Sequence, residues 1–237
     1  MRYLWQIDAE FARAEKHTAP PLAGDTVQAL FWNAVAARKN DVWLRQKELG
    51  IWRAWTWHET GEIVKEIAMG LHALGMQVQD RVSILANTRA EWLWADLAIL
   101  SLGGTSAGIY PTDAASQVHY ILSDSQSRFL FVEDEEQLDK VLEVLPDLPH
   151  LVKIIVLDDK GLRHFEHPQV LSLEALRQLG AKATALDPQG LDTIRQASSP
   201  EHLAILVYTS GTTGKPKGAM HHHAGLVYAI RGHTQII

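Results

Sequence analysis

The feature that most constrains the fold is a regular alternation of strand-like and helix-like segments between residues 81 and 157. Short apolar runs predict strands at Arg81–Ala86, Ser106–Tyr110, Arg128–Val132 and Lys153–Leu157. The segments between them predict helices at Ala90–Leu102, Ala114–Ser123 and Glu135–Leu145. Strands joined through helices form right-handed crossovers with helices on both faces of the sheet. The sequence therefore predicts an α/β fold with a largely parallel sheet layered with helices.

Further elements flank this alternating region. Before it we expect a helix at Val27–Ala37 capped by Asp25 or Thr26, a hairpin of Val42–Gln46 and Ile51–Trp57, and a helix from Thr56 or His58 to Leu74 that stops at Gly75. After it we expect a helix at Leu171–Leu179, irregular chain at Gly180–Pro200 and a strand at Leu203–Tyr208. The tryptophans near the hairpin are interpreted as core and strand-face residues and not as a recognition site: Trp43, Trp52, Trp55 and Trp57.

Composition excludes several classes of function. The 237 residues carry 22 basic and 28 acidic side chains, a formal charge of −6, which offers no basic surface for nucleic acid. The absence of cysteine excludes a disulfide scaffold and a cysteine nucleophile. Met1–Lys16 has no uninterrupted apolar segment of the secretory kind, and Leu97–Thr112 is too short to span a membrane. We expect a cytoplasmic protein with a lead-in at residues 1–25, and peripheral membrane contact stays open.

The apolar run Leu203–Tyr208 leads into a segment whose composition suits phosphate binding. Hydroxyl groups come from Thr209, Ser210, Thr212 and Thr213. Backbone amides can approach an anion closely at Gly211, Gly214 and Gly218, because glycine has no Cβ. Positive charge comes from Lys215 and Lys217. The spacing is not that of a Walker A loop, because Pro216 stands where a second glycine is needed. On composition alone, a surface turn between two strands explains the segment equally well.

The literal string favours the phosphate interpretation. Y-T-S-G-T-T-G-K-P-K-G at Tyr208–Gly218 resembles the AMP-binding signature of the adenylate-forming superfamily, and Gly75–Trp92 and Ala95–Thr112 resemble its first strand-helix units. Ile109-Tyr110-Pro111-Thr112 and His119–Ser125 resemble the long-chain fatty acyl-CoA synthetase branch. In such enzymes ATP and a carboxylate form an acyl adenylate, from which coenzyme A displaces AMP. The resemblance implies an ATP-binding segment made of Tyr208, Thr209, Ser210, Gly211, Thr212, Thr213, Gly214, Lys215, Pro216, Lys217 and Gly218.

Within that segment the resemblance implies that Thr209 and Lys217 stabilise phosphate charge, and it assigns no certain catalytic residue to the chain. It aligns His223 with a family histidine near the carboxylate pocket, whereas His221 and His222 are expected to have no chemical role. Three consecutive residues cannot share one face of a helix or strand, so we expect no metal site made of these histidines alone.

The family's later motifs have no counterpart in the chain: the Y-G-x-T-E segment, the ribose-binding aspartate, the hinge and the catalytic lysine of the lid. The resemblance therefore implies that residues 26–237 are the N-terminal part of the large domain of an enzyme that uses ATP, Mg²⁺ and coenzyme A. We expect this portion to be inactive alone and to self-associate through an exposed sheet edge. Two alternatives stay open: a non-catalytic module derived from the family, and an adenylation domain for another carboxylate.

Overall fold

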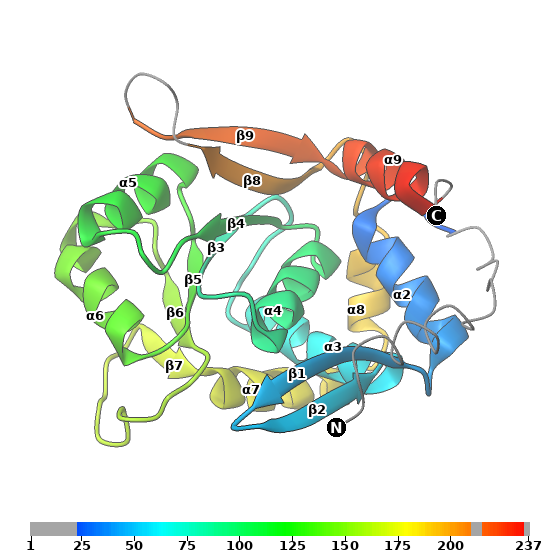
Figure 1. The fold of residues 1–237 in the computed structure, drawn as a ribbon, viewed down its shortest axis with the longest axis horizontal. Coiled ribbons are helices and arrows are strands. Elements are labelled where there is room, and N and C mark those ends of the chain that lie inside the picture. Colours follow the sequence, from blue (N-terminus) through cyan, green and yellow to red (C-terminus); the bar gives the residue numbers. More distant parts are fainter. Residues whose placement is uncertain (1–22, 210–214, 235–237) are drawn as a thin grey trace, which may run out of the picture.

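The computed structural model describes residues 23–209 and 215–234. Its centre is a seven-stranded sheet (Figure 1) in the order β7-β6-β5-β3-β4-β8-β9. The strands are β3 (Arg81–Leu85), β4 (Thr105–Ile109), β5 (Phe129–Val132), β6 (Lys153–Val156), β7 (Val170–Ser172), β8 (Leu203–Thr209) and β9 (Lys217–His222). Every neighbouring pair is parallel except β8–β9, which is antiparallel. The predicted α/β fold with a largely parallel sheet is confirmed.

Helices cover both faces of this sheet. They are α2 (Val27–Arg38), α3 (Trp57–Ala73), α4 (Ala90–Ser101), α5 (Ala115–Ser125), α6 (Glu135–Val144), α7 (Leu173–Leu186), α8 (Gly190–Arg195) and α9 (His223–Thr234), with a 3₁₀ turn at Leu145–Asp147. In β5, Phe129 and Phe131 join the core formed with α3, α4 and α7, whereas Leu130 and Val132 join the core formed with α5 and α6. The two-residue period of a strand thus divides one apolar run between two cores.

Capping residues set the helix boundaries that the sequence predicted. The Thr26 hydroxyl accepts a hydrogen bond from the Ala29 amide at the start of α2. Thr56 and Glu59 form a reciprocal capping box at the start of α3. After α3, Gly75 adopts a φ of +90°, which glycine tolerates best. Thr26 and Thr56 are therefore the caps, and the alternatives Asp25 and His58 were wrong.

The prediction of irregular chain at Gly180–Pro200 was wrong. Helix α7 continues through Gly180 to Leu186, and α8 follows at Gly190–Arg195. Gly180 is not a stop signal, because an added Cβ there would lie 1.7 Å from the Glu66 carbonyl oxygen of α3. The glycine instead lets the backbones of α3 and α7 approach closely. Three further elements, β7, β9 and α9, were also not predicted from the sequence.

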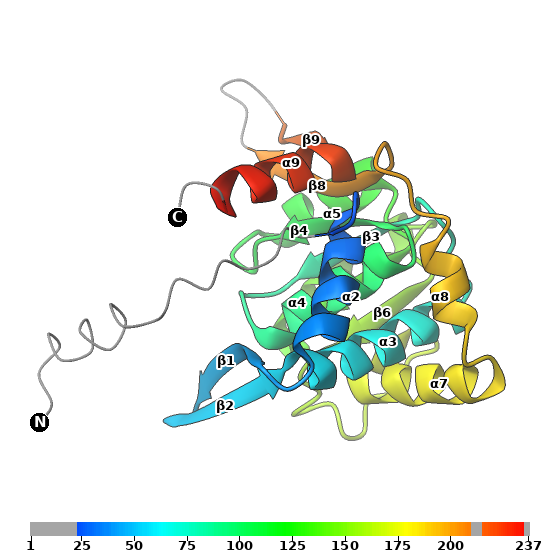
Figure 2. The same ribbon diagram turned by 90° about the vertical axis from the view of Figure 1, so that its right-hand side faces the viewer.

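A two-stranded hairpin lies outside the main sheet. It consists of β1 (Val42–Glu48) and β2 (Ile51–Thr56), and it projects from the helical layers (Figure 2). Trp43 stacks on Trp57 with ring centroids 4.7 Å apart, and Trp55 meets Trp94 edge to face at 5.4 Å, as core packing predicts. Trp52 is the exception, because it is 64% exposed near the hairpin turn.

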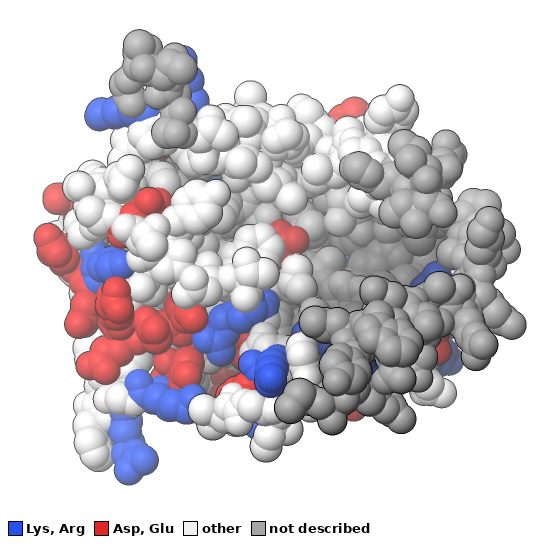
Figure 3. All heavy atoms as spheres, viewed as in Figure 1, with Lys and Arg blue, Asp and Glu red and all other residues white. Residues whose placement is uncertain are grey.

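Charged side chains are unevenly distributed over the surface. Figure 3 shows Asp and Glu gathered at the left of the view, over α6. This helix begins at the cap Asp134 and carries Glu135 and Glu136 in its first turn, where negative charge complements the helix dipole. Within the described part of the chain, no helix is both long enough and apolar enough to cross a membrane.

Candidate functional site

The hairpin of β8 and β9 presents the predicted phosphate-binding segment. Thr209 pairs with Lys217 at the last rung of the ladder, so the two arms of the segment leave the sheet side by side. Because β8 is parallel to β4, the segment starts at the carboxyl edge of the parallel sheet, where α/β proteins commonly bind ligands. The predicted position after a strand is thereby confirmed, and residues 210–214 lie outside the described residues.

Tyr208 anchors the first arm of the segment. Its hydroxyl donates a 2.7 Å hydrogen bond to Oδ2 of Asp124 in α5. Burial raises the pKa of the Tyr208 phenol above its usual value, and the hydrogen bond to Asp124 raises it further, so the phenol stays a donor. An added Cβ at Gly218 would lie 3.1 Å from Cζ of Tyr208. The structure thus gives Gly218 a packing role under the tyrosine ring.

The second arm rests against Tyr120 of α5. The Tyr120 hydroxyl donates a 2.9 Å hydrogen bond to the carbonyl oxygen of Pro216, and Nζ of Lys215 lies 5.1 Å from the centre of the Tyr120 ring. Lys217 is exposed on β9. In the described chain no carboxylate forms an ion pair with Lys215 or Lys217. Both ammonium groups are therefore available to an anion at this edge of the sheet.

A cleft of about 310 Å³ lies beside the base of this segment, at the carboxyl ends of β3, β4 and β8. Most of its lining is apolar, with hydroxyl and amide groups at intervals, which is typical of small-molecule sites. The lining residues are Ala86, Asn87, Thr88, Trp92, Ser106, Gly108, Ile109, Tyr110, Pro111, Ile205, Leu206, Val207 and Tyr208. Tyr208 is shared between the cleft and the phosphate-binding segment, so the two are continuous.

A buried carboxyl group supports the floor of the cleft. The Ser106 hydroxyl donates a 2.5 Å hydrogen bond to Oδ1 of Asp96 in α4. Burial raises the pKa of Asp96 to about 6, and the hydrogen bond from Ser106 opposes this rise only in part. Asp96 was not predicted from the sequence, although one carboxyl group within an apolar helical run was an available signal.

Hydrogen bonds and ion pairs fix the edge of the cleft at the carboxyl ends of β3 and β5. The backbone amide and the side-chain amide of Asn87 both donate to Oε2 of Glu133, at 2.6 and 2.8 Å. Arg89 forms ion pairs with Glu133 at 3.4 Å and with Glu91 at 2.8 Å. These contacts fix Asn87 and Thr88 relative to the neighbouring strand. The contacts with Glu133 join residues distant in sequence, and no local pattern predicted them.

His223 lies apart from the phosphate-binding segment. It is the first residue of α9 and follows His222, which pairs with Leu203 at the start of β8. The length of β8 therefore separates it from Thr209, at the other end of that strand. At about 3.3 Å for each residue, that separation is roughly 20 Å. The structure therefore brings Tyr208, Thr209, Lys215, Pro216, Lys217 and Gly218 together and leaves His223 at the other end of the hairpin.

The His223 side chain is fully buried. Its Nδ1 accepts a hydrogen bond from the Val27 amide at the start of α2, at 3.3 Å, whereas Nε2 is buried with no partner among the described residues. Burial lowers the pKa of His223 to about 4, with smaller contributions from His202 and His222. The imidazole is therefore neutral at physiological pH, with its proton on Nε2.

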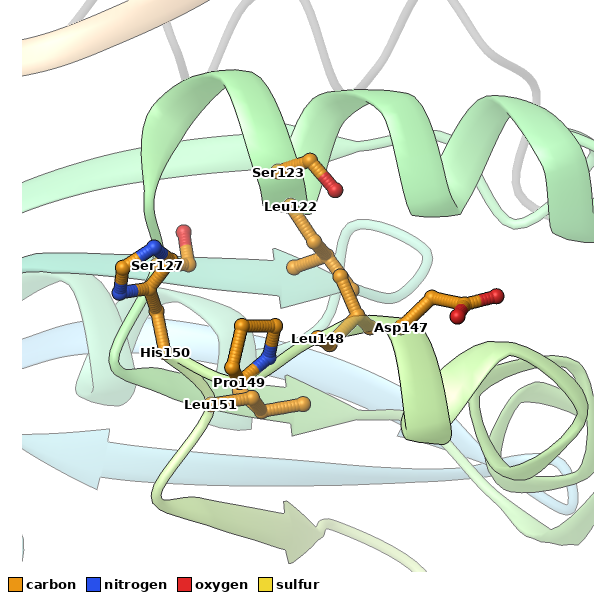
Figure 4. A pocket seen from close by; sticks show the side chains of 8 residues that line it. All are labelled: Leu122, Ser123, Ser127, Asp147, Leu148, Pro149, His150 and Leu151. Atoms are coloured by element: carbon orange, nitrogen blue, oxygen red, sulfur yellow. The ribbon is translucent and has the colours of Figure 1, made fainter.

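Another hollow, of about 230 Å³, lies near the amino ends of β5 and β6, where Ser127 and Leu151 precede the two strands. Figure 4 shows its charged and ionisable side chains, Asp147 and His150, pointing in opposite directions. Ser127 is buried and bonds to Ser83 and Ser125. The polar groups therefore do not converge on one ligand, and this hollow is the weaker candidate.

The sequence model of the family described as AMP-binding enzyme matches residues 31–236. The chain belongs to this family. The resemblance to the adenylate-forming superfamily is thereby confirmed.

Among curated proteins, the chain is 32% identical over 228 residues to the long-chain-fatty-acid–CoA ligase ACSBG2 of Xenopus laevis, a match covering 95% of the chain and 30% of that protein. It is 34% identical over 183 residues to the long-chain-fatty-acid–CoA ligase FadD15 of Mycobacterium tuberculosis, covering 77% of the chain and 29% of that protein. The chain thus spans less than a third of the length of these relatives.

Solved structures agree on the fold. The anthranilate CoA ligase AuaEII in complex with anthranoyl-AMP is similar with a TM-score of 0.70 and 25% identity, over 86% of the chain and 36% of that protein. The luciferase-like enzyme of the mealworm Zophobas morio matches with a TM-score of 0.70 and 18% identity, over 86% of the chain and 44% of that protein. Both match over less than half of their own length.

Proposed function

We propose that the chain is the N-terminal part of the large domain, residues 26–237, of an AMP-forming acyl-CoA synthetase. The whole protein would activate a long-chain fatty acid with ATP to an acyl adenylate and then transfer the acyl group to coenzyme A. The observation that carries this proposal is the continuity of two features: a lysine- and hydroxyl-rich segment at the carboxyl edge of the sheet and an apolar-lined cleft that shares Tyr208 with it.

In this proposal the segment Tyr208–Gly218 binds the β and γ phosphates of ATP. The Thr209 hydroxyl would donate to phosphate oxygens, and Lys215 and Lys217 would offset their charge as pyrophosphate leaves. Contacts with α5 support this role, because Asp124 holds the first arm and Tyr120 holds the second. Donors held in advance stabilise developing charge without first having to be ordered.

The cleft is suited to the organic part of the substrate. Ile109, Ile205 and Val207 offer apolar surface that an acyl group can cover, and Ser106 is a polar group held by Asp96 on the floor. The names of ACSBG2 and FadD15 favour a long-chain fatty acid. A second candidate, an aromatic carboxylate, is favoured by the ring systems of Trp92, Tyr110 and Tyr208 in the lining and by the likeness to AuaEII.

Two features of the proposal need residues beyond those described. Within the described ranges, no group of three or more His, Asp or Glu side chains could hold a metal ion, so magnesium bound with ATP would take its ligands from the nucleotide or from elsewhere in the protein. A role for His223 in the carboxylate pocket also stays a proposal. Its buried Nε2 needs an acceptor that the described chain does not supply.

The experiment is acid-dependent exchange of pyrophosphate into ATP, measured on the whole protein that carries this chain. Lys217→Ala is expected to lower the exchange rate on the order of 10²-fold, because it removes a charged donor from the phosphates. Lys182→Ala, at an exposed position on α7, is the matched control. Unchanged exchange in Lys217→Ala would remove Lys217 from the site.

The same exchange assay with a series of carboxylic acids separates the candidate functions. Exchange supported by long-chain fatty acids confirms the first, exchange supported only by aromatic acids favours the second, and no exchange with any carboxylate indicates a non-catalytic module. We expect the chain of residues 1–237 alone, given ATP, magnesium, coenzyme A and fatty acid, to release no more AMP than its Lys217→Ala variant. Release above that control would place the catalytic groups within the chain.

A further inference from the structure

We propose that the β1–β2 hairpin is a membrane-surface anchor that inserts its end into the headgroup region of an anionic lipid bilayer. This inference is independent of the proposed enzymatic function, since it rests on a surface remote from the β8–β9 segment. It begins from three side chains at the end of the hairpin, Leu49, Ile51 and Trp52, which are 98%, 71% and 64% exposed. We call these three residues the apolar tip.

The apolar tip occupies both faces of the hairpin and the turn between its strands. Glu48 pairs with Ile51 and Lys47 pairs with Trp52, so Ile51 and Trp52 point to opposite faces of the hairpin while Leu49 lies in the turn between the strands. Closer to the body, Leu44 and Trp55 on the face of Ile51 pack against the core. The hairpin extends beyond the helices (Figure 2), and the exposed fractions of Ile51 and Trp52 show that the described part of the chain leaves both faces of its end largely uncovered. Exposed apolar residues that occur singly need no explanation, but three at the end of one projecting hairpin do.

The turn itself disfavours Leu49. Leu49 and Gly50 adopt φ angles of +47° and +86°, as a two-residue type I′ turn requires. Asn, Asp and Gly tolerate such angles, whereas a bulky apolar residue is strained there. Leucine at this position is therefore unfavourable for the backbone and unfavourable in water. Contact with an apolar phase outside the protein would offset these two costs.

Charges around the tip indicate which surface it meets. Residues 42–56 carry three basic side chains, Arg45, Lys47 and Arg53, and one acidic side chain, Glu48, so the hairpin has a formal charge of +2 in a chain of −6. Arg53 pairs with Glu48 at 3.2 Å, and Nζ of Lys47 lies 5.9 Å from the centre of the Trp52 ring. An anionic surface would attract the basic side chains of the hairpin.

This charge distribution favours a bilayer over a second copy of the chain. Two copies meeting tip to tip would bring their Arg45 and Lys47 side chains together, and like charges oppose that contact. A bilayer interface accepts all three kinds of side chain, because leucine and isoleucine enter the acyl boundary, tryptophan prefers the headgroup level, and basic groups reach the lipid phosphates.

The test is flotation of the chain with vesicles of phosphatidylcholine alone and of an equal mixture of phosphatidylcholine and phosphatidylglycerol. We expect binding to the anionic vesicles, lowered by about tenfold or more in Leu49→Glu. Leu186→Glu, at a residue that is 89% exposed at the end of α7, is the matched control and should bind as the unchanged chain does. Arg45→Gln should lower binding about fivefold on anionic vesicles, with no change on neutral ones.

Leu49→Asn separates lipid contact from folding. Asparagine suits the type I′ turn, so this variant should unfold at the same temperature as the unchanged chain or higher, and yet bind vesicles more weakly. Several results would overturn the proposal: no binding by the unchanged chain, equal losses in Leu49→Glu and Leu186→Glu, or full binding by Leu49→Asn. A change of oligomeric state in Leu49→Glu with unchanged flotation would assign the tip to a second copy instead.

Discussion

Replacing the buried Asp96 by asparagine is expected to stabilise the protein at neutral pH. Asp96 is 9% exposed, and its burial raises the pKa to about 6 from an ordinary value of 3.8. A carboxyl group with a higher pKa in the folded state favours folding when it is protonated. The stability it contributes is therefore complete below about pH 3.8 and is lost as the pH rises through about 6.

The expected size of the effect follows from these two pKa values. At about 1.4 kcal/mol for each pH unit, the gap between them corresponds to about 3 kcal/mol at pH 8. Asparagine has nearly the same shape, carries no charge, and keeps an oxygen that accepts the hydrogen bond of Ser106. For a domain of this size, about 3 kcal/mol corresponds to a rise of roughly 6–12 °C in Tm.

The assay is thermal unfolding followed by circular dichroism between pH 4 and pH 8. The difference in Tm between Asp96→Asn and the unchanged chain should be near zero at the acid end and should grow through about pH 6. Asp139→Asn, on the exposed side of α6, should change stability by less than about 0.5 kcal/mol at every pH. A difference that does not depend on pH, or a less stable Asp96→Asn variant at pH 8, would refute the reasoning.

Four further outcomes are expected. Gly180→Ala should lower the free energy of unfolding in urea by about 1–3 kcal/mol, because the new methyl group meets the backbone of α3, whereas Gly225→Ala, with open space around it, should be neutral or stabilising. The unchanged chain should lose stability as the pH falls from 6.5 to about 4, because the buried imidazole of His223 must gain a proton in that range. His223→Gln should not show this loss, and the Tm of the two proteins measured across this pH range checks it. Tyr208→Phe should lower the free energy of unfolding in urea by about 0.5–1.5 kcal/mol, because it removes one hydrogen bond whose acceptor, Asp124, is exposed and can bind water instead, and an unchanged midpoint would contradict this. Residues 1–237 alone should self-associate through the edge of β9, measured as a sedimentation coefficient that rises with concentration.

The sequence by itself determined the features that depend on neighbouring residues. Short apolar runs such as Phe129–Val132, separated by helix-like segments such as Glu135–Leu145, predicted the alternating fold, because neighbouring residues determine whether a segment favours a strand or a helix. Caps and stops were predictable for the same reason, since Thr56 and Gly75 act on backbone groups a few residues away. The string at Tyr208–Gly218 was sufficient to predict the family.

Only the tertiary structure decided the features that depend on residues far apart in the chain. Gly180 was indistinguishable from a helix stop until Glu66, more than a hundred residues earlier, filled the space of its missing side chain. The support of Tyr208 by Asp124 also joins residues that no local pattern relates. The alignment of His223 with a carboxylate pocket stays a prediction, and only the course of β9 decided that this residue lies at the other end of the hairpin from Thr209. Local sequence encodes local geometry, whereas the burial that raises the pKa of Asp96 and lowers that of His223 exists only once distant elements pack together.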